Sequence, residues 1–307
     1  MGITAANLAL AQQSTDDLEV RSALSGPIES LSMLRRSLLF AELSGISYLS
    51  RAEAGRLALR IGLPEIRFYE RDGAQAYIFA NEHDAVVTCR GTEPHEWNDL
   101  RADLNAALAA AETVGRVHRG FKQEVDDLWP RLEQALESNR RTLWFTGHSL
   151  GAAMAAICAG RCKLSRIHSD PRALFTFGSP RVGNARYVNY VKIETYRWVN
   201  NNDIVTRVPP TWMGYRHKGG ELYLNAYGQV RQLARWQRTK DRWRGFLRGL
   251  REGRIDHFAD HSIVRYVEYI HRAVVEEESI AASLRSLQKL PFAAPAASPA
   301  RPLRRAA

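Results

Sequence analysis

Residues 142–156 have the sequence TLWFTGHSLGAAMAA, which is the strongest indication of the fold in the chain. Residues 142–146 are aromatic or β-branched apart from one leucine, which predicts a short buried strand. After Gly151 the chain is rich in Ala, Met and Ile, with no Gly or Pro before Gly160, which predicts a helix. Between them lies G-x-S-x-G, a sharp turn that presents Ser149 at a helix N-terminus. Taken alone, the pentapeptide is also compatible with a glycine-flanked serine at an ordinary turn.

The rest of the chain extends this pattern on both sides. Apolar residues at helical spacing predict helices over four ranges: 28–49, 51–61, 121–137 and 182–194. Short β-branched and aromatic runs predict strands over five ranges: 66–69, 76–80, 85–89, 173–177 and 196–199. Because strands alternate with helices from residue 121 onward, we expect a largely parallel sheet with right-handed crossovers.

Composition bounds the class of protein. The chain has 307 residues, of which 45% are hydrophobic, enough for one large globular domain. We expect that domain to span 28–290, after a flexible polar lead-in over 1–27. The Pro-, Ala- and Ser-rich residues 291–307 predict a disordered tail.

Several classes of protein are excluded by what the sequence lacks. It has no run of eighteen apolar residues and no basic segment ahead of its short N-terminal Ala/Leu stretch, so neither a transmembrane helix nor a cleavable signal peptide is expected. This favours a cytoplasmic or peripheral membrane location, with export by a signal-less route left open. Cys89, Cys158 and Cys162 are interpreted as core thiols. No metal-binding spacing is present, and no metal is expected.

A serine nucleophile needs a base, which in turn needs a carboxylate to orient it. In α/β-hydrolases the acid follows the serine along the chain, on a loop after a later strand. Asp203 comes soon after the predicted strand 196–199, at the sheet edge where such sites collect. Asp170 precedes a predicted strand and is the weaker candidate.

The base must follow the acid in the same chain order. His257 and His261 both precede the last helical pattern, 263–270, and spacing alone does not separate them. His217 is a further candidate. The segment Asp260-His261-Ser262 places a histidine beside a helix start, from which it can project.

At this point the chain resembles a known family, the class 3 lipases, which comprise the fungal-type triacylglycerol lipases and their bacterial relatives. The resemblance rests on blocks in family order: CRGT at 89–92, VHRGF at 117–121, GHSLG at 147–151, FGSPRVGN at 177–184, DIVTRVPP at 203–210, and DHS at 260–262 with Tyr266. It implies an α/β-hydrolase fold in which Ser149 is the nucleophile, Asp203 the acid and His261 the base. Cys89 departs from the family, where an aromatic residue is common.

The same resemblance implies an oxyanion hole. Its first backbone donor is the residue after Arg-Gly, which is Thr92, and its second is Leu150, directly after the nucleophile. Backbone N–H groups aimed at the developing alkoxide are typically worth roughly 3–4 kcal/mol of barrier each. No cofactor is expected for this chemistry.

The resemblance also implies a lid between Thr92 and Val117. Within a predicted helix over 96–112, several apolar residues share one face: Trp97, Leu100, Leu104, Leu108 and Ala111. A lid helix would shield the serine in water and open on lipid. The alternative is a helix packed permanently on the domain.

The net charge of +10 is concentrated in one segment. Residues 229–254 contain nine basic side chains against two acidic ones, a net +7. Its pattern predicts a basic amphipathic helical insert, with membrane-contact candidates Arg235, Arg238, Arg242, Trp243 and Arg244. A docked helix with snorkelling arginines is the alternative. No nucleic-acid motif accompanies the charge, and nucleic acid is not expected as a partner.

These observations predict a serine carboxylic-ester hydrolase acting on lipids. A phospholipase acting on anionic membranes is the enzymatic alternative. A catalytically silent lipase-like interaction protein is another, although the intact Ser, Asp and His argue against it. Acyl-chain length, head group and oligomeric state are not specified by the sequence.

Overall fold

The computed structural model describes residues 18–91, 107–165, 167–231, 237, 239–241 and 259–288. Several predicted positions lie outside the described residues: Thr92, Trp97, Leu100, Leu104, Arg235, Arg238, Arg242, Trp243, Arg244 and His257. The same holds for 1–17 of the lead-in, most of the insert 229–254 and the whole tail 291–307. The chain divides into two compact units, Met1–Val274 and Val275–Ala307. The expected domain 28–290 extends across this division, since helix α9 (Ile263–Gln288) runs through it.

In the described part of the chain, a central sheet contains eight strands in the order β1-β2-β3-β6-β7-β9-β11-β12. Their bounds are β1 Glu65–Arg71, β2 Ala74–Ala80, β3 Asp84–Cys89, β6 Thr142–His148, β7 Pro171–Phe177, β9 Thr195–Asn200, β11 Gly220–Leu224 and β12 Val230–Arg231. Neighbouring strands from β3 to β11 run parallel, while β1, β2 and β12 pair antiparallel at the two edges. The six strands predicted from sequence, 142–146 among them, all form.

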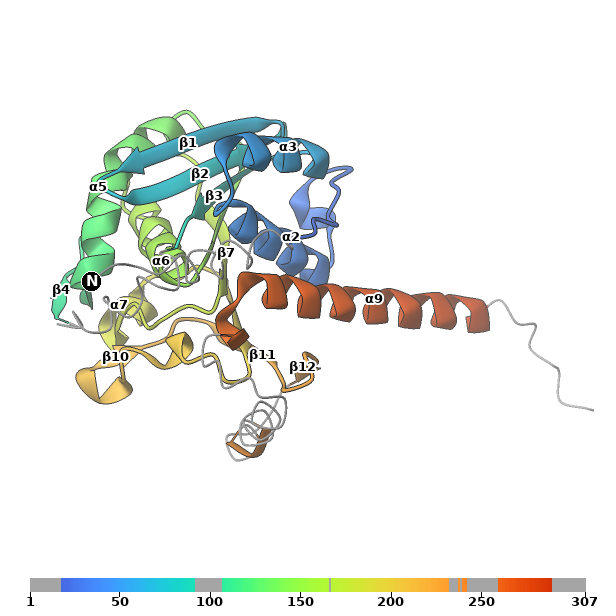
Figure 1. Ribbon diagram of the computed structural model, residues 1–307. Coiled ribbons are helices and arrows are strands. Elements are labelled where there is room, and N and C mark those ends of the chain that lie inside the picture. Colours follow the sequence, from blue (N-terminus) through green and yellow to red (C-terminus); the bar gives the residue numbers. More distant parts are fainter. Residues whose placement is uncertain are drawn as a thin grey trace, which may run out of the picture. The chain divides into compact units, whose positions relative to one another are not determined.

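Helices cover both faces of this sheet (Figure 1). One face packs against α2 (Met33–Ile46), α3 (Arg51–Ile61) and the start of α9. The other packs against α5 (Arg119–Leu136), α6 (Leu150–Cys162) and α7 (Ala185–Tyr190). Short 3-10 turns complete the helical elements: η1 Ile28–Ser30, η2 Val205–Arg207, η3 Thr211–Met213 and η4 Ala259–His261.

The strands read as apolar runs because both of their faces are buried. In β2, Ala76 and Ile78 enter the core under α5 and α6, while Tyr77 and Phe79 enter the core under α2 and α3. Helix α6 is buried along its whole length, which explains its small side chains. Its one charged residue, Arg161, forms an ion pair with Glu112 at 2.9 Å and another with Asp126.

A second sheet corrects the prediction for 96–112. Its strands are β4 (Leu108–Ala110), β5 (Arg116–His118), β8 (Gly183–Asn184) and β10 (Tyr215–Arg216), in the order β10-β8-β5-β4. The predicted helix was therefore wrong over 108–110, where the chain pairs antiparallel with β5. Leu108, Ala109 and Ala110 favour a helix locally, so the pairing with β5 overrides their local preference.

The predicted helix 182–194 was too long for a similar reason. Gly183 and Asn184 belong to β8, and the Asn184 side chain accepts the backbone N–H of Tyr187 at 3.0 Å. This cap starts α7 at Ala185, and the helix ends at Tyr190.

The basic insert also begins differently from the prediction. Val230 and Arg231 form β12, which pairs antiparallel with β11, so the predicted helix does not start at Gln229. Residues 237 and 239–241 are helical. The strand forms because β11 offers a free edge, a signal that lies outside the segment itself.

The end of the predicted lead-in is held to the domain. The backbone N–H groups of Arg21 and Ser22 donate to the Glu42 carboxylate at 2.8 and 3.1 Å, and Leu24 donates to the carbonyl of Ile61 at 2.7 Å. Burial raises the pKa of Glu42, partly offset by these hydrogen bonds. These contacts join residues 21–24 of the lead-in to α2 and α3.

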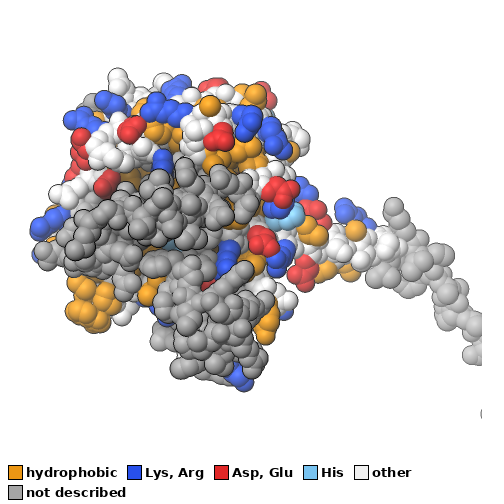
Figure 2. Space-filling view, in the orientation of Figure 1, with side chains coloured by type: hydrophobic (Ala, Val, Ile, Leu, Met, Phe, Trp, Pro, Cys, Tyr) orange, Lys and Arg blue, Asp and Glu red, His pale blue; other side chains and the backbone are white. Residues whose placement is uncertain are grey.

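The described surface carries charges of both signs. Figure 2 shows Lys and Arg side chains interspersed with Asp and Glu around β1 and α3, including an ion pair of 3.1 Å between Arg51 and Glu70. Among the described helices, none combines the length and the apolar character needed to cross a membrane.

Candidate active site

Ser149 lies on the turn between β6 and α6, in a backbone conformation that side chains rarely adopt. Its φ is 58° and its ψ is −130°, a strained combination typical of functional turns. A Cβ on Gly147 would overlap the carbonyl of Gly151. A Cβ on Gly151 would overlap the Cys89 carbonyl and lie 2.7 Å from the Gly91 nitrogen. Only glycine fits at both positions, so this is not an ordinary turn.

The structure brings Ser149, His261 and Asp203 into one hydrogen-bonded chain. The Nε2 atom of His261 lies 2.8 Å from the Ser149 Oγ, and its Nδ1 lies 3.0 Å from each carboxylate oxygen of Asp203. Their exposed fractions are 1%, 2% and 0% in the order Ser149, His261, Asp203. Because a carboxylate only accepts, Nδ1 donates to it, and Nε2 is left to accept the serine hydroxyl proton. This is the arrangement that activates a serine.

Two of the other candidates, His217 and Asp170, lie elsewhere. The Nε2 atom of His217 is 2.7 Å from the Thr206 carbonyl oxygen, and Asp170 forms an exposed ion pair of 2.9 Å with Lys163. His257 lies outside the described residues. Of the histidines that sequence spacing left open, His261 is the one seen against Ser149.

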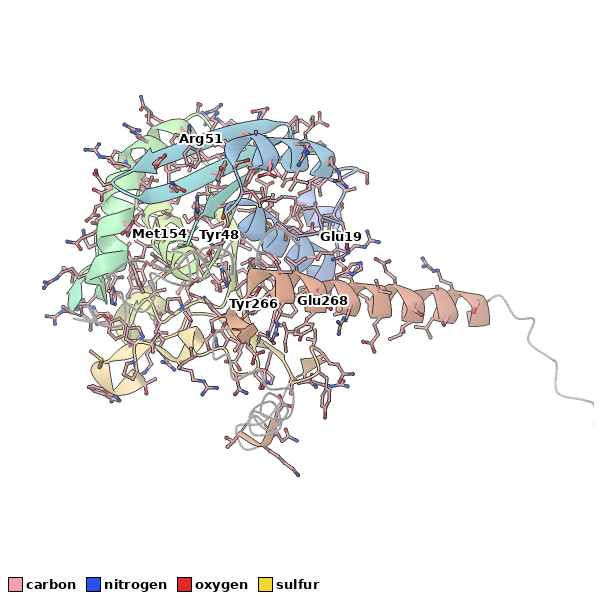
Figure 3. The ribbon with its side chains drawn as sticks, in the orientation of Figure 1. Glu19, Tyr48, Arg51, Met154, Tyr266 and Glu268 are labelled. Carbon is pink, nitrogen blue, oxygen red and sulfur yellow. The ribbon has the colours of Figure 1, made fainter. Side chains whose placement is uncertain are left out.

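The Asp203 carboxylate is held by donors that sequence reasoning did not assign. Tyr266, labelled on α9 in Figure 3, donates its hydroxyl to Asp203 Oδ2 at 2.6 Å, and the N–H of Val205 donates to Oδ1 at 3.0 Å. The Asn200 N–H in turn donates to the Tyr266 hydroxyl at 2.9 Å. Burial, with the adjacent carboxylate, raises the pKa of Tyr266 well above its usual value, so the phenol remains a donor.

Gly178 makes room for the acid and the base. Its φ is +59°, and a Cβ there would lie 2.8 Å from Asp203 Oδ2 and 2.8 Å from His261 Cε1. Gly178 belongs to the block 177–184, on which the resemblance to class 3 lipases partly rests. The glycine has a physical reason, because any side chain would push the Asp203–His261 pair apart.

The loop that carries His261 is tied down next to β9. The Asn200 side-chain amide donates to the Asp260 carbonyl at 3.0 Å, and the Asn202 N–H donates to the Asp260 carboxylate at 3.2 Å. Arg265 donates to the same carboxylate at 3.1 Å. Burial raises the pKa of Asp260, and Arg265 acts in the opposite direction.

Leu150 is the one predicted oxyanion donor within the described residues. It is the first residue of α6, so its N–H belongs to the first turn, where backbone donors have no partner inside the helix. The positive end of the helix dipole lies at the same place and favours a developing negative charge. Thr92, the other predicted donor, lies outside the described residues.

The cysteines are placed in the core as expected. Cys89, Cys158 and Cys162 are free and buried, and a hydrogen bond with Cys158 together with burial raises the pKa of Cys89 well above its usual value. Within the described ranges, no group of three or more His, Cys, Asp or Glu residues could hold a metal ion.

Known proteins share sequence and fold with the part of the chain that carries this site. Residues 86–213 match the family model described as lipase (class 3). Over this stretch the chain is therefore similar to the class 3 lipases. The matched residues include Ser149 and Asp203, while His261 lies beyond them.

Curated relatives match parts of this chain. It is 30% identical over 219 residues to toxin TseL of Vibrio cholerae, covering 57% of this chain and 34% of that one. It is 36% identical over 132 residues to a secreted mono- and diacylglycerol lipase of Fusarium solani, covering 42% of this chain and 32% of that one. The chain thus spans about a third of the length of these relatives.

Solved structures confirm the fold of the chain. Lipase II from Rhizopus niveus matches with a TM-score of 0.51 and 22% identity, covering 62% of this chain and 80% of that one. A triacylglycerol lipase described as having a serine protease triad matches with a TM-score of 0.52 and 24% identity, covering 66% and 82%. The predicted α/β-hydrolase fold, with a mostly parallel sheet flanked by helices, is therefore correct.

Proposed function

We propose that this protein is a serine carboxylic-ester hydrolase that acts on lipids. The observation that carries the proposal is the buried hydrogen-bonded chain from Ser149 through His261 to Asp203. Its members come from three separate turns of the fold, and their order along the chain is that of α/β-hydrolases.

In the proposed reaction, Ser149 Oγ attacks the ester carbonyl carbon while His261 Nε2 takes its proton. Asp203 stabilises the imidazolium that forms. The N–H groups of Leu150 and Thr92 bind the oxyanion of the tetrahedral intermediate. Collapse of the intermediate breaks the bond to the alcohol, which leaves with the proton from His261. Water then attacks the acyl-enzyme, again with His261 as base, and releases the carboxylic acid and free Ser149.

The substrate part of the proposal rests on the relatives. One is named a mono- and diacylglycerol lipase and a structural neighbour is titled a triacylglycerol lipase, which favours glycerol esters. A phospholipase is the second candidate, favoured by the net +7 of residues 229–254, because phospholipid surfaces are commonly anionic.

We also propose a lid, a membrane-contacting segment and a location for the protein. Trp97, Leu100 and Leu104 belong to a lid that ends before β4. Arg235, Arg238, Arg242, Trp243 and Arg244 contact an anionic membrane. The protein is cytoplasmic or peripheral to a membrane.

An activity-based fluorophosphonate probe tests the proposal, because it reacts with an activated serine and not with an ordinary one. We expect labelling of the wild-type protein and none of Ser149→Ala. A panel of p-nitrophenyl esters, triacylglycerols and phospholipids then separates esterase, lipase and phospholipase. An unlabelled wild-type protein that hydrolyses none of these substrates would support the silent interaction protein instead.

A further inference from the structure

His148 lies directly beside the site, and none of the steps above uses it. Its ring centroid is 4.5 Å from that of His261 and 5.9 Å from that of Tyr48. The side chain is 5% exposed. Tyr48 follows α2, about a hundred residues earlier in the chain, and Figure 3 labels it on the inner side of that helix. Two distant parts of the chain therefore meet at His148.

The hydrogen bonds of His148 determine its tautomer. Its Nε2 lies 2.7 Å from the backbone carbonyl oxygen of His261, and since a carbonyl only accepts, Nε2 carries the proton. Its Nδ1 lies 3.0 Å from the Tyr48 hydroxyl. In the neutral ring Nδ1 accepts, so Tyr48 is the donor. Burial lowers the pKa of His148 well below its usual value, and the electrostatic effect of the nearby His261 lowers it further. The ring is therefore neutral.

This contact holds the His261 main chain directly, whereas the contacts described above hold its imidazole and the neighbouring Asp260. Ser149 and Asp203 bind the His261 imidazole, while His148 binds its main chain. Without that donor the carbonyl would be a buried acceptor lacking this partner, which is unfavourable. The residue would be free to shift toward another donor, and misplacement of a reacting group by about 1 Å can cost about 100-fold in rate.

We propose that His148 is a positioning residue that fixes the main chain of His261, and that Tyr48 keeps His148 in the donating tautomer. The inference rests on the proposed ester hydrolysis and adds to it a Tyr48–His148–His261 chain. A neutral His148 is suited to this place, because a second imidazolium 4.5 Å from His261 would oppose the positive charge that His261 acquires when it takes the serine proton.

Paired substitutions test whether the hydrogen bond or the mere bulk of the ring matters. His148→Leu removes the donor, whereas His148→Gln keeps an amide N–H that can reach the His261 carbonyl. On a soluble short-chain p-nitrophenyl ester, we expect His148→Leu to lower kcat at least about 10-fold with KM changed less than about 2-fold. His148→Gln should retain kcat within about 3-fold of wild type. His83→Leu, at an exposed position before β3, is the matched control and should be silent.

Tyr48→Phe provides an independent variant, since it keeps the ring and removes only the donor to Nδ1. We expect a smaller fall in kcat, about 3-fold, with unchanged thermal stability relative to Tyr227→Phe, an exposed control. If His148→Leu does not fold, the comparison of His148→Gln with Tyr48→Phe decides. A Gln variant near wild type with a slower Phe variant supports the chain, and the reverse order overturns it.

Two results contradict the inference directly. One is a folded His148→Leu protein with kcat within 2-fold of wild type. The other is a folded His148→Gln protein that is as slow as His148→Leu, which would assign the effect to ring packing. Failure of the proposed function looks different, since the wild-type protein itself would then neither hydrolyse the ester nor react with the fluorophosphonate.

Discussion

The turn that carries Ser149 and the loop that carries His261 lie against each other but are held by different means. The Ser149 turn is built from adjacent residues, with Gly147 and Gly151 packed against each other and against the end of β3. The His261 loop takes its contacts from far along the chain: Asp203 lies 58 residues away and Ser149 lies 112 residues away. Local backbone geometry therefore sets the nucleophile, and tertiary packing sets the base.

The largest effect is expected at the locally built turn. Ser149→Ala should reduce ester hydrolysis at least about 10⁴-fold, because every later step depends on the acyl-enzyme. Thermal unfolding should change little, since one buried hydroxyl is lost and the turn is kept. Retention of more than about a hundredth of wild-type turnover would exclude Ser149 as the nucleophile. Ser138→Ala, at an exposed site ahead of β6, is the control.

The base should be nearly as sensitive as the nucleophile. His261→Ala removes the proton acceptor 2.8 Å from Ser149 and should lower kcat by a similar factor, roughly 10⁴-fold or more. His257→Ala should leave turnover close to wild type. Measuring both on the same soluble ester separates them, and a reversal of the two results would make His257 the base.

Gly178→Ala tests the close packing of Gly178 against Asp203 and His261. The added methyl would meet both Asp203 and His261 at 2.8 Å, so we expect kcat to fall about 10- to 100-fold. Gly73→Ala is a matched control, because Gly73 also has a positive φ of 90° but has nothing within 4 Å of its added Cβ. Both variants should lose about 1–2 kcal/mol of stability from the backbone conformation. Equal kcat for the two variants would show that Gly178 is needed for its conformation alone.

The smallest effect on turnover is expected at His118, which caps α5 away from the serine turn. Burial lowers the pKa of His118 from 6.5 to about 4. The unfolded chain therefore binds a proton between pH 6.5 and pH 4 that the folded protein does not, and stability falls as pH falls through that window. The effect is about 2–3 kcal/mol.

His118→Asn keeps an acceptor for the Phe121 N–H, which His118 Nδ1 accepts at 3.4 Å, and removes the titrating ring. Urea unfolding at pH 7 and pH 4.5 should show a smaller loss of stability in the variant than in the wild type. An identical loss in both proteins would assign the acid sensitivity to other groups, such as His148 or His217, whose pKa values are also lowered by burial.

The long elements could be predicted because their sequences carry their own signals. Buried strands such as β6 are continuous apolar runs, and α3 begins after a capping serine and ends at Gly62. The short strands β4, β8 and β12 could not, because two or three residues have no period of their own. Each exists only where a partner strand supplies hydrogen bonds.

The same division holds at the site. The sequence alone predicted the turn at Ser149, from G-x-S-x-G together with the strand before it and the helix after it. It also pointed to Asp203 through the strand that precedes that residue. It did not separate His261 from His257, for which the family resemblance was needed. Only the tertiary structure gave Tyr266, Gly178, His148 and Tyr48 their partners. The physical reason is that hydrogen bonds act over about 3 Å in space, and no spacing along the chain records which distant residues the fold brings that close.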